Sequence, residues 1–205
     1  MGDSTNGSSG AREGKYNQIR YYISLSHAEQ VAGIIPLGTS LDAESARSVE
    51  LGCRDGVETL TPWIEELQGI ESNPSFKPSD EFASLIFKTG FNDIPHENYE
   101  FWFETLRKAW SGDDGRRRAR MCVLNLRDRD GLHGRLFDIR CPVLRMHGTE
   151  DAIYSVRNAE EEMKLFVNSS DARLKVVEGG SHYLNYTHAG QVDAVLVEFL
   201  SRYAG

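Results

Sequence analysis

The hydrophobic pattern is most regular in the C-terminal third of the chain. Residues 141–148, CPVLRMHG, form a mostly apolar run with the length of a buried parallel strand, and residues 172–180, ARLKVVEGG, predict a second short strand. Ser155 can cap a helix between the two runs, and apolar residues recur with helical spacing over 192–203. The order strand, helix, strand, helix predicts an α/β fold with a parallel sheet and right-handed crossovers.

The N-terminal pattern predicts a helix followed by a strand. Apolar positions over residues 12–26 share one helical face, and residues 31–38, VAGIIPLG, have the character of a short buried strand. We expect Pro36 near the end of that strand, because proline donates no hydrogen bond to a sheet. Residues 1–11 are polar and glycine-rich between their two ends, and we expect them to form a flexible leader.

The middle of the chain has a different texture. Residues 41–136 hold all three tryptophans and show no convincing strand period. Proline-containing loops separate four helical patterns, which are GVETLTPWIEELQGI, SDEFASLIFKTGF, ENYEFWFETLRKAW and RRRARMCVLNLRDRDGL. We therefore predict a helical insertion at 41–136 between two portions of an α/β core, at 12–40 and 137–205.

Charge and cysteine content narrow the class of partner and compartment. The 205 residues carry a net charge of −8, which argues against nucleic acid or an anionic membrane as a partner. The basic cluster at 116–120 follows the acidic SGDDG and predicts a solvated helix start. Three cysteines without C-x-x-C spacing fit a reducing compartment, and we expect a cytoplasmic protein. No apolar run approaches the roughly 20 residues of a membrane span.

Two candidate catalytic residues follow the two C-terminal strands. Asp151 comes shortly after the first strand, and His182 comes after the second, in EGGSHYLN. Ligands and catalysis lie at the carboxyl ends of parallel strands, where neighbouring loops meet. A carboxylate there can accept a hydrogen bond from imidazole and stabilise the imidazolium that forms during proton transfer. The paired glycines at 179–180 keep the backbone turn tight beside the imidazole.

These motifs resemble the C-terminal part of an α/β-hydrolase. CPVLRMHGTEDAIYSV followed by EGGSHYLNYTHAGQVDAVLVEFL is similar to the family pattern of strand, H-G-x-x-D, helix, strand, G-G-x-H and closing helix. HAEQVAGIIPLGTS resembles the segment after the nucleophile helix, with Ala28 at the usual proline position. The resemblance implies that Asp151 is the acid and His182 the base of a catalytic triad. It also implies that the helical insertion at 41–136 is a lid.

The family's nucleophile elbow, G-x-S-x-G, has no clear counterpart. Counting back from the predicted strand leads to residues near Gly14, where no Ser, Cys or Asp stands. GDSTNG and GSSGA resemble the elbow only loosely, and the residues before Ser4 and Ser9 do not form a strand pattern. We therefore expect a truncated sheet of the α/β-hydrolase type, without the nucleophile and the oxyanion-hole loop.

Three functional classes stay open, of which the third is a structural protein that uses the helical insertion at 41–136 for assembly. The first is a hydrolase of small esters, lactones or related C–C substrates through a Ser-His-Asp triad, which this chain carries only in part. The second is a non-catalytic relative that binds a small apolar ligand or a partner protein. No cofactor is implied. Without its usual neighbour, the strand at 31–38 would leave an apolar edge, so we also expect marginal stability, self-association or reliance on a partner.

Several further residues have alternative interpretations. We expect His147 to make a structural hydrogen bond at the end of its strand. His188 lies six residues after His182, which is not the spacing of a helical zinc site, so we expect no metal. The remaining histidines are expected at the surface: His27, His96 and His133. Four aromatic residues either line a pocket under the lid or pack the lid onto the core: Phe101, Trp102, Phe103 and Trp110.

Overall fold

The computed structural model describes residues 30–69, 71–92 and 98–203. The predicted leader at 1–11 and the predicted helix at 12–26 lie outside these residues. Within the described residues, no helix is both long enough and apolar enough to cross a bilayer.

The predicted strand–helix–strand–helix order of the C-terminal part is confirmed. Strand β1 (Val143–Gly148) and strand β2 (Ala172–Val177) pair in parallel, and helix α7 (Val156–Met163) connects them. The chain ends in the short helix α8 (Leu184–Thr187) and the long helix α9 (Ala189–Tyr203). Ser155 caps α7 as predicted, because its side chain accepts a hydrogen bond from Asn158 N.

The predicted strand at 31–38 pairs with β1, but it is interrupted. Two isolated parallel bridges join it to β1, at Ile34 with Val143 and at Leu37 with Met146. Pro36 lies in the middle of this ladder and not near its end. Its carbonyl accepts a hydrogen bond from Met146 N at 2.9 Å, but proline has no N–H to donate in return. The ladder therefore loses one rung, and the segment forms bridges in place of a regular strand.

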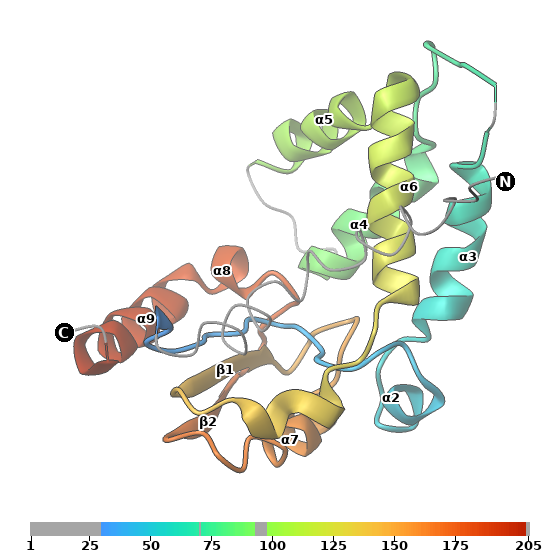
Figure 1. Ribbon diagram of the computed structural model, residues 1–205. Coiled ribbons are helices and arrows are strands. Elements are labelled where there is room, and N and C mark those ends of the chain that lie inside the picture. The colour runs from blue at the N-terminus through green and yellow to red at the C-terminus, as the bar shows by residue number, and fades with distance from the viewer. Residues whose placement is uncertain (1–29, 70, 93–97, 204–205) are drawn as a thin grey trace, which may run out of the picture.

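Strand β1 is buried on both faces because helices cover the sheet from two sides. All six residues of β1 are buried. Alternate side chains point to opposite faces, so Arg145 meets α7 on one side while Met146 packs with Val192 of α9 on the other. Figure 1 shows α7 and α9 on different sides of the two strands. A core with helices on both faces of a parallel sheet is an α/β architecture.

The middle of the chain is helical, as its sequence pattern predicts. Its helices are α2 (Ala46–Glu50), α3 (Gly56–Glu66), α4 (Asp80–Phe91), α5 (Tyr99–Ala109) and α6 (Gly112–Asp128), followed by the 3₁₀ helix η4 (His133–Asp138). Figure 1 shows α3, α4, α5 and α6 standing together as a block beside the strands. We call α3 to α6 the helical block; its boundaries as a separate lid stay a prediction.

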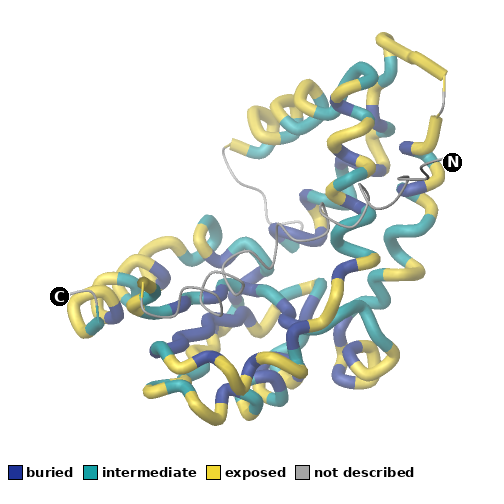
Figure 2. Tube along the Cα trace, in the orientation of Figure 1, coloured by how far each residue is buried: buried dark blue, intermediate teal, exposed yellow. Residues whose placement is uncertain are grey.

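The helical block has its own apolar core. Phe82 of α4 stacks between Trp63 and Trp110, with ring centroids 5.2 and 5.3 Å apart. Figure 2 shows that α5 is covered least, and none of its residues is buried. The basic cluster of α6 is only partly solvated. Arg117 is 73% exposed at its side chain, but Arg116 is 12% exposed and donates to Glu71 O.

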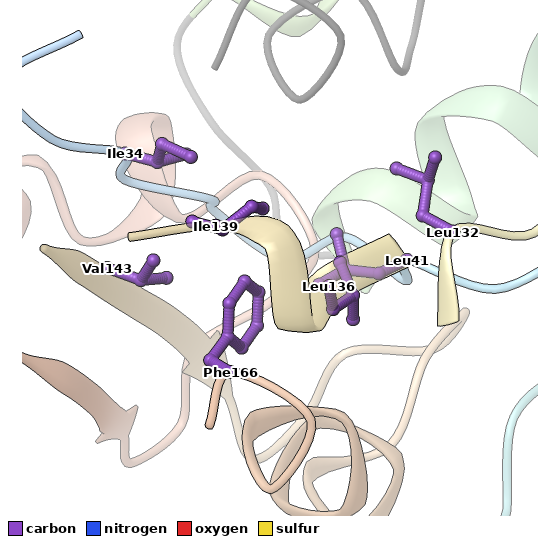
Figure 3. Close-up of a cluster of buried hydrophobic side chains, with 7 residues drawn as sticks. All are labelled: Ile34, Leu41, Leu132, Leu136, Ile139, Val143 and Phe166. Carbon is purple, nitrogen blue, oxygen red and sulfur yellow. The ribbon is translucent and has the colours of Figure 1, made fainter. Parts of the chain in front are cut away.

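A second apolar cluster joins the two ends of the middle segment to the sheet. Figure 3 shows Phe166, which follows α7, beside Val143 of β1, with residues from both sides of the insertion close by. The cluster's buried members are Ile34, Leu41, Leu132, Leu136, Ile139, Val143 and Phe166. Because Leu41 and Leu132 lie at opposite ends of the inserted segment, their burial together fixes where the helices leave and rejoin the core.

Candidate active site

The loop after β1 holds the carboxylate of Asp151 in one orientation. Its Oδ1 accepts hydrogen bonds from the backbone N–H groups of Ile153 at 2.8 Å and Tyr154 at 3.0 Å. The side chain is completely buried. These two donors leave Oδ2 free to face the neighbouring loop, where the acceptor can meet a single further donor.

That donor is His182, on the loop after β2. Its Nδ1 lies 3.0 Å from Asp151 Oδ2, and its side chain is 20% exposed. Because an ionised carboxylate only accepts hydrogen bonds, this contact makes Nδ1 the protonated nitrogen and leaves Nε2 as the basic one. The structure therefore brings together the two residues that the sequence analysis singled out.

Two glycines allow the loops to approach this closely. A Cβ on Gly148 would lie 2.0 Å from the carbonyl oxygen of Gly180, so the ends of β1 and β2 meet without side chains between them. Gly38 has φ +54°, in the left-handed region that favours glycine, and a Cβ there would lie 2.5 Å from the carbonyl oxygen of His182. The chain at Gly38 can thus pass against the backbone of His182 and beside the Asp151 carboxylate.

The predicted structural hydrogen bond of His147 is confirmed. Its Nε2 donates to Tyr154 O at 2.8 Å, and burial lowers the pKa of the imidazole. His147 is therefore neutral at pH 7, and its 3.6 Å approach to Asp151 Oδ2 is not an ion pair there. The hydrogen bond from His147 to Tyr154 O fixes the C-terminal part of the loop that carries Asp151. The Asp151 carboxylate holds the same part of the loop through the N–H groups of Ile153 and Tyr154.

A cavity of about 560 Å³ opens beside His182. The segment at 34–39 supplies one part of its wall, and α3, α4 and the end of α6 supply another. A volume of this size suits a small organic ligand. The apolar lining residues from the helices are Leu60, Leu85, Ile86 and Leu126. The cavity thus lies between the helical block and the carboxyl ends of the strands, with an imidazole in its wall.

A buried polar cluster ties both ends of the middle segment to the Asp151 loop. Arg129, after α6, donates to Glu44 Oε1 and to the Tyr154 hydroxyl, both at 2.9 Å. The Tyr154 hydroxyl in turn donates to Glu44 Oε1 at 3.2 Å. Burial raises the pKa of Glu44, which Arg129 opposes, and burial also raises the pKa of Tyr154. Tyr154 therefore links the cavity wall directly to the loop that carries Asp151.

A second buried cluster centres on Glu162 of α7. It forms an ion pair with Arg145 of β1, and neither side chain is exposed. Its Oε1 also accepts from Ser40 Oγ at 2.8 Å and from Leu41 N at 2.9 Å. His133 approaches the same oxygen at 3.2 Å, and this hydrogen bond raises the pKa of the imidazole. The side chain of His133 is 35% exposed, so the expected surface position holds in part, although one ring nitrogen joins a buried network.

The sequence analysis also made predictions about four aromatic residues, about further histidines and serines, and about a metal site. None of the four aromatic residues lines the cavity: Trp110 and Phe103 pack within the helical block, whereas Phe101 and Trp102 are 63% and 44% exposed. His27 and His96 lie outside the described residues, as do Ser4 and Ser9. In the part of the chain that the structure describes, no three His, Cys, Asp or Glu side chains gather as metal ligands.

Solved structures with a similar fold include esterases and other hydrolases. A hydrolase from Oleispira antarctica superposes with a TM-score of 0.67 and 16% identity, over 90% of this chain and 61% of its own. An esterase from Exiguobacterium antarcticum gives a TM-score of 0.61 and 20% identity, over 87% and 62%. The chain has the α/β-hydrolase fold.

The sequence resembles known proteins only distantly. A Synechocystis sp. protein that carries the name non-heme chloroperoxidase is 34% identical over 62 residues, which cover 30% of this chain and 22% of that protein. No protein-family model matches the sequence. The chain spans about three fifths of the length of the solved structures it matches. The activity of such enzymes therefore enters only as a proposal.

Sequence reasoning missed the residues around the imidazole. Arg54, Glu44, Arg129 and Tyr154 all line the cavity. Glu44 and Arg129 are separated by 85 residues, and their pairing depends on how the helical block folds back. In the sequence, Glu44 and Arg129 stand near the two ends of the predicted insertion, beside predicted helices. Their position could have marked them as candidates, but the sequence does not show that they pair with each other.

Proposed function

We propose that this chain carries the acid–base pair of an α/β-hydrolase that cleaves small esters, lactones or related C–C substrates. His182 is the general base, and Asp151 orients it and stabilises the imidazolium. The observation that supports this most is the hydrogen bond between His182 Nδ1 and the buried Asp151 Oδ2, in an imidazole that also lines a cavity. A structural histidine would not need a ligand-sized space in front of it.

In this proposal each nitrogen of the imidazole has a separate role. With Nδ1–H held by Asp151, Nε2 can take the proton of a serine hydroxyl as that oxygen attacks a carbonyl carbon. The same nitrogen then returns the proton to the leaving group. In the second half of the cycle it takes a proton from water, which attacks the acyl carbon, and returns that proton to the serine oxygen as the acid is released. His147 keeps the Asp151 loop in place and takes no proton, since burial holds it neutral.

The serine itself is the part of the proposal that needs an experiment most. Among the described residues, His182 has a carboxylate partner and no serine partner. Ser4 and Ser9 lie outside them, and the matched structures are longer than this chain. We propose that the pair acts with a serine of this chain that lies outside the described residues.

Hydrolysis of p-nitrophenyl butyrate tests the proposal. We expect turnover by the chain and a loss of roughly 100-fold or more in His182→Ala, because a positioned base contributes about 10² to 10⁴. His188→Ala is the matched control, since its imidazole hydrogen-bonds to Thr187 Oγ1 and is not among the described residues that line the cavity. Equal rates in the wild type and His182→Ala, both above the buffer rate, would overturn the proposal.

The alternative is a binding protein without turnover. It is favoured by the cavity together with the lack of a serine partner for His182 in the described residues. Such a protein would leave p-nitrophenyl butyrate intact while methyl pentanoate still bound in a saturable way, measured by ligand-observed NMR. Substrate turnover that depends on His182 would exclude this alternative.

A further inference from the structure

The charged groups of the cavity wall are unevenly paired. Within the described lining there are two guanidinium groups, Arg54 and Arg129, and one carboxyl group, Glu44. The side chain of Arg129 is 4% exposed and forms an ion pair with Glu44. One positive charge therefore remains without a negative partner in the wall of a partly apolar cavity, where an anionic group of a ligand can pair with it.

That remaining charge belongs to Arg54. The backbone of Arg54 is fixed, because its N–H donates to Ile153 O at 2.8 Å, two residues from Asp151. Its side chain makes no hydrogen bond or ion pair with the described residues. The adjacent Asp55 does not neutralise it by contact, because Asp55 caps α3 by accepting from Glu58 N at 2.9 Å. Arg54 thus lines the same cavity as His182 with a free guanidinium.

We propose that the cavity takes an ester or lactone whose acyl part bears a free carboxylate, and that Arg54 binds this carboxylate. The inference rests on the proposed function for the reaction, but the binding subsite stands on its own contacts. A planar guanidinium matches a carboxylate through two parallel hydrogen bonds. A carboxylate also balances the single unpaired charge, whereas a doubly charged phosphate would leave negative charge beside Glu44. The methylene chain between the two ends contacts Ile and Leu side chains of the wall.

A matched pair of ligands tests this subsite directly. Monomethyl glutarate and methyl pentanoate have the same acyl length, and only the first ends in a carboxylate. We expect monomethyl glutarate to bind the full chain about tenfold more tightly at low salt, measured by calorimetry or by ligand-observed NMR. Arg54→Gln should remove the difference without loss of fold, because this side chain holds no other part of the protein. Arg117→Gln, the control, removes the same charge from an exposed ion pair on α6 and should keep the difference.

Turnover of the same two esters separates this inference from the proposed function. Preferential hydrolysis of the half-ester, lost in Arg54→Gln, supports both. Preferential binding without hydrolysis of either ester supports the subsite and contradicts the hydrolase proposal. Equal affinity for the two esters, no binding of either, or a preference that Arg54→Gln retains would overturn the subsite.

Discussion

Replacing Glu162 with glutamine removes the negative charge at the centre of the network that joins α7 to both ends of the inserted segment. The substitution keeps size and shape, but it leaves Arg145 as a buried guanidinium without its counter-ion. Breaking a buried pair from one side costs about 3–5 kcal/mol, because the remaining charge stays desolvated. We therefore expect Glu162→Gln to be strongly destabilised at pH 7.

The titration of Glu162 gives a second route to the same magnitude. Burial alone would raise its pKa, but the hydrogen bond with His133, the Arg145 charge and the donors at 40–41 together lower it from 4.5 to about 2. At about 1.36 kcal/mol per pH unit, this amounts to about 3 kcal/mol of stability at pH 7. A lowered pKa stabilises the fold above pH 4.5, and the contribution is lost as the pH falls toward 2. Linkage leaves about 1.5 kcal/mol of it at pH 3.

Urea unfolding at pH 7 and pH 3 measures this dependence. The free-energy difference between the wild type and Glu162→Gln should shrink by roughly half between the two pH values. Glu161→Gln is the matched control, because the neighbouring carboxylate is 42% exposed and pairs only with Lys164. It should leave stability nearly unchanged at both pH values. A difference for Glu162→Gln that is small, or the same at pH 7 and pH 3, would refute the reasoning.

Three further predictions concern Tyr154, Gly38 and the segment at 31–38. Tyr154→Phe removes the hydroxyl that links Glu44 and Arg129 and should cost about 1–2 kcal/mol in urea unfolding; an unchanged midpoint would contradict this linkage. Gly38→Ala places a methyl group 2.5 Å from the carbonyl oxygen of His182 at a φ of +54°, so it should lower both stability and ester turnover; full activity would show that the loop does not need the glycine. Self-association through the segment at 31–38 stays a prediction, and elution from a sizing column that does not change with protein concentration would speak against it.

The sequence predicted the elements that local pattern determines. The strands at 143–148 and 172–177 stand out because both are short apolar runs with turn residues after them, and the long C-terminal helix has a clear apolar face. Asp151 and His182 follow from these elements, since the ends of neighbouring parallel strands must meet. The hydrogen bond between them needed no information beyond strand order.

The local sequence pattern could not predict contacts between segments that are far apart in the chain. His133 was expected at the surface because it stands in a polar turn, yet it meets Glu162 across the fold. Pro36 was expected near a strand end, but flanking residues make enough hydrogen bonds with β1 to tolerate the missing rung. The cavity wall depends on the packing of α3, α4 and α6, which periodicity does not specify. The exposed aromatic pair on α5 shows that aromatic residues near a site need not face it.

Labelling by a fluorophosphonate tests most directly whether Asp151 and His182 form a working acid–base pair. The reagent reacts with a serine only when an adjacent base activates it, and mass spectrometry identifies the residue. The account predicts labelling of one serine in the wild type. Asp151→Asn should label slower by about 10³-fold or more, because the amide stabilises the wrong tautomer of His182. Absence of labelling in the wild type, or equal labelling rates in the wild type and Asp151→Asn, would contradict the account.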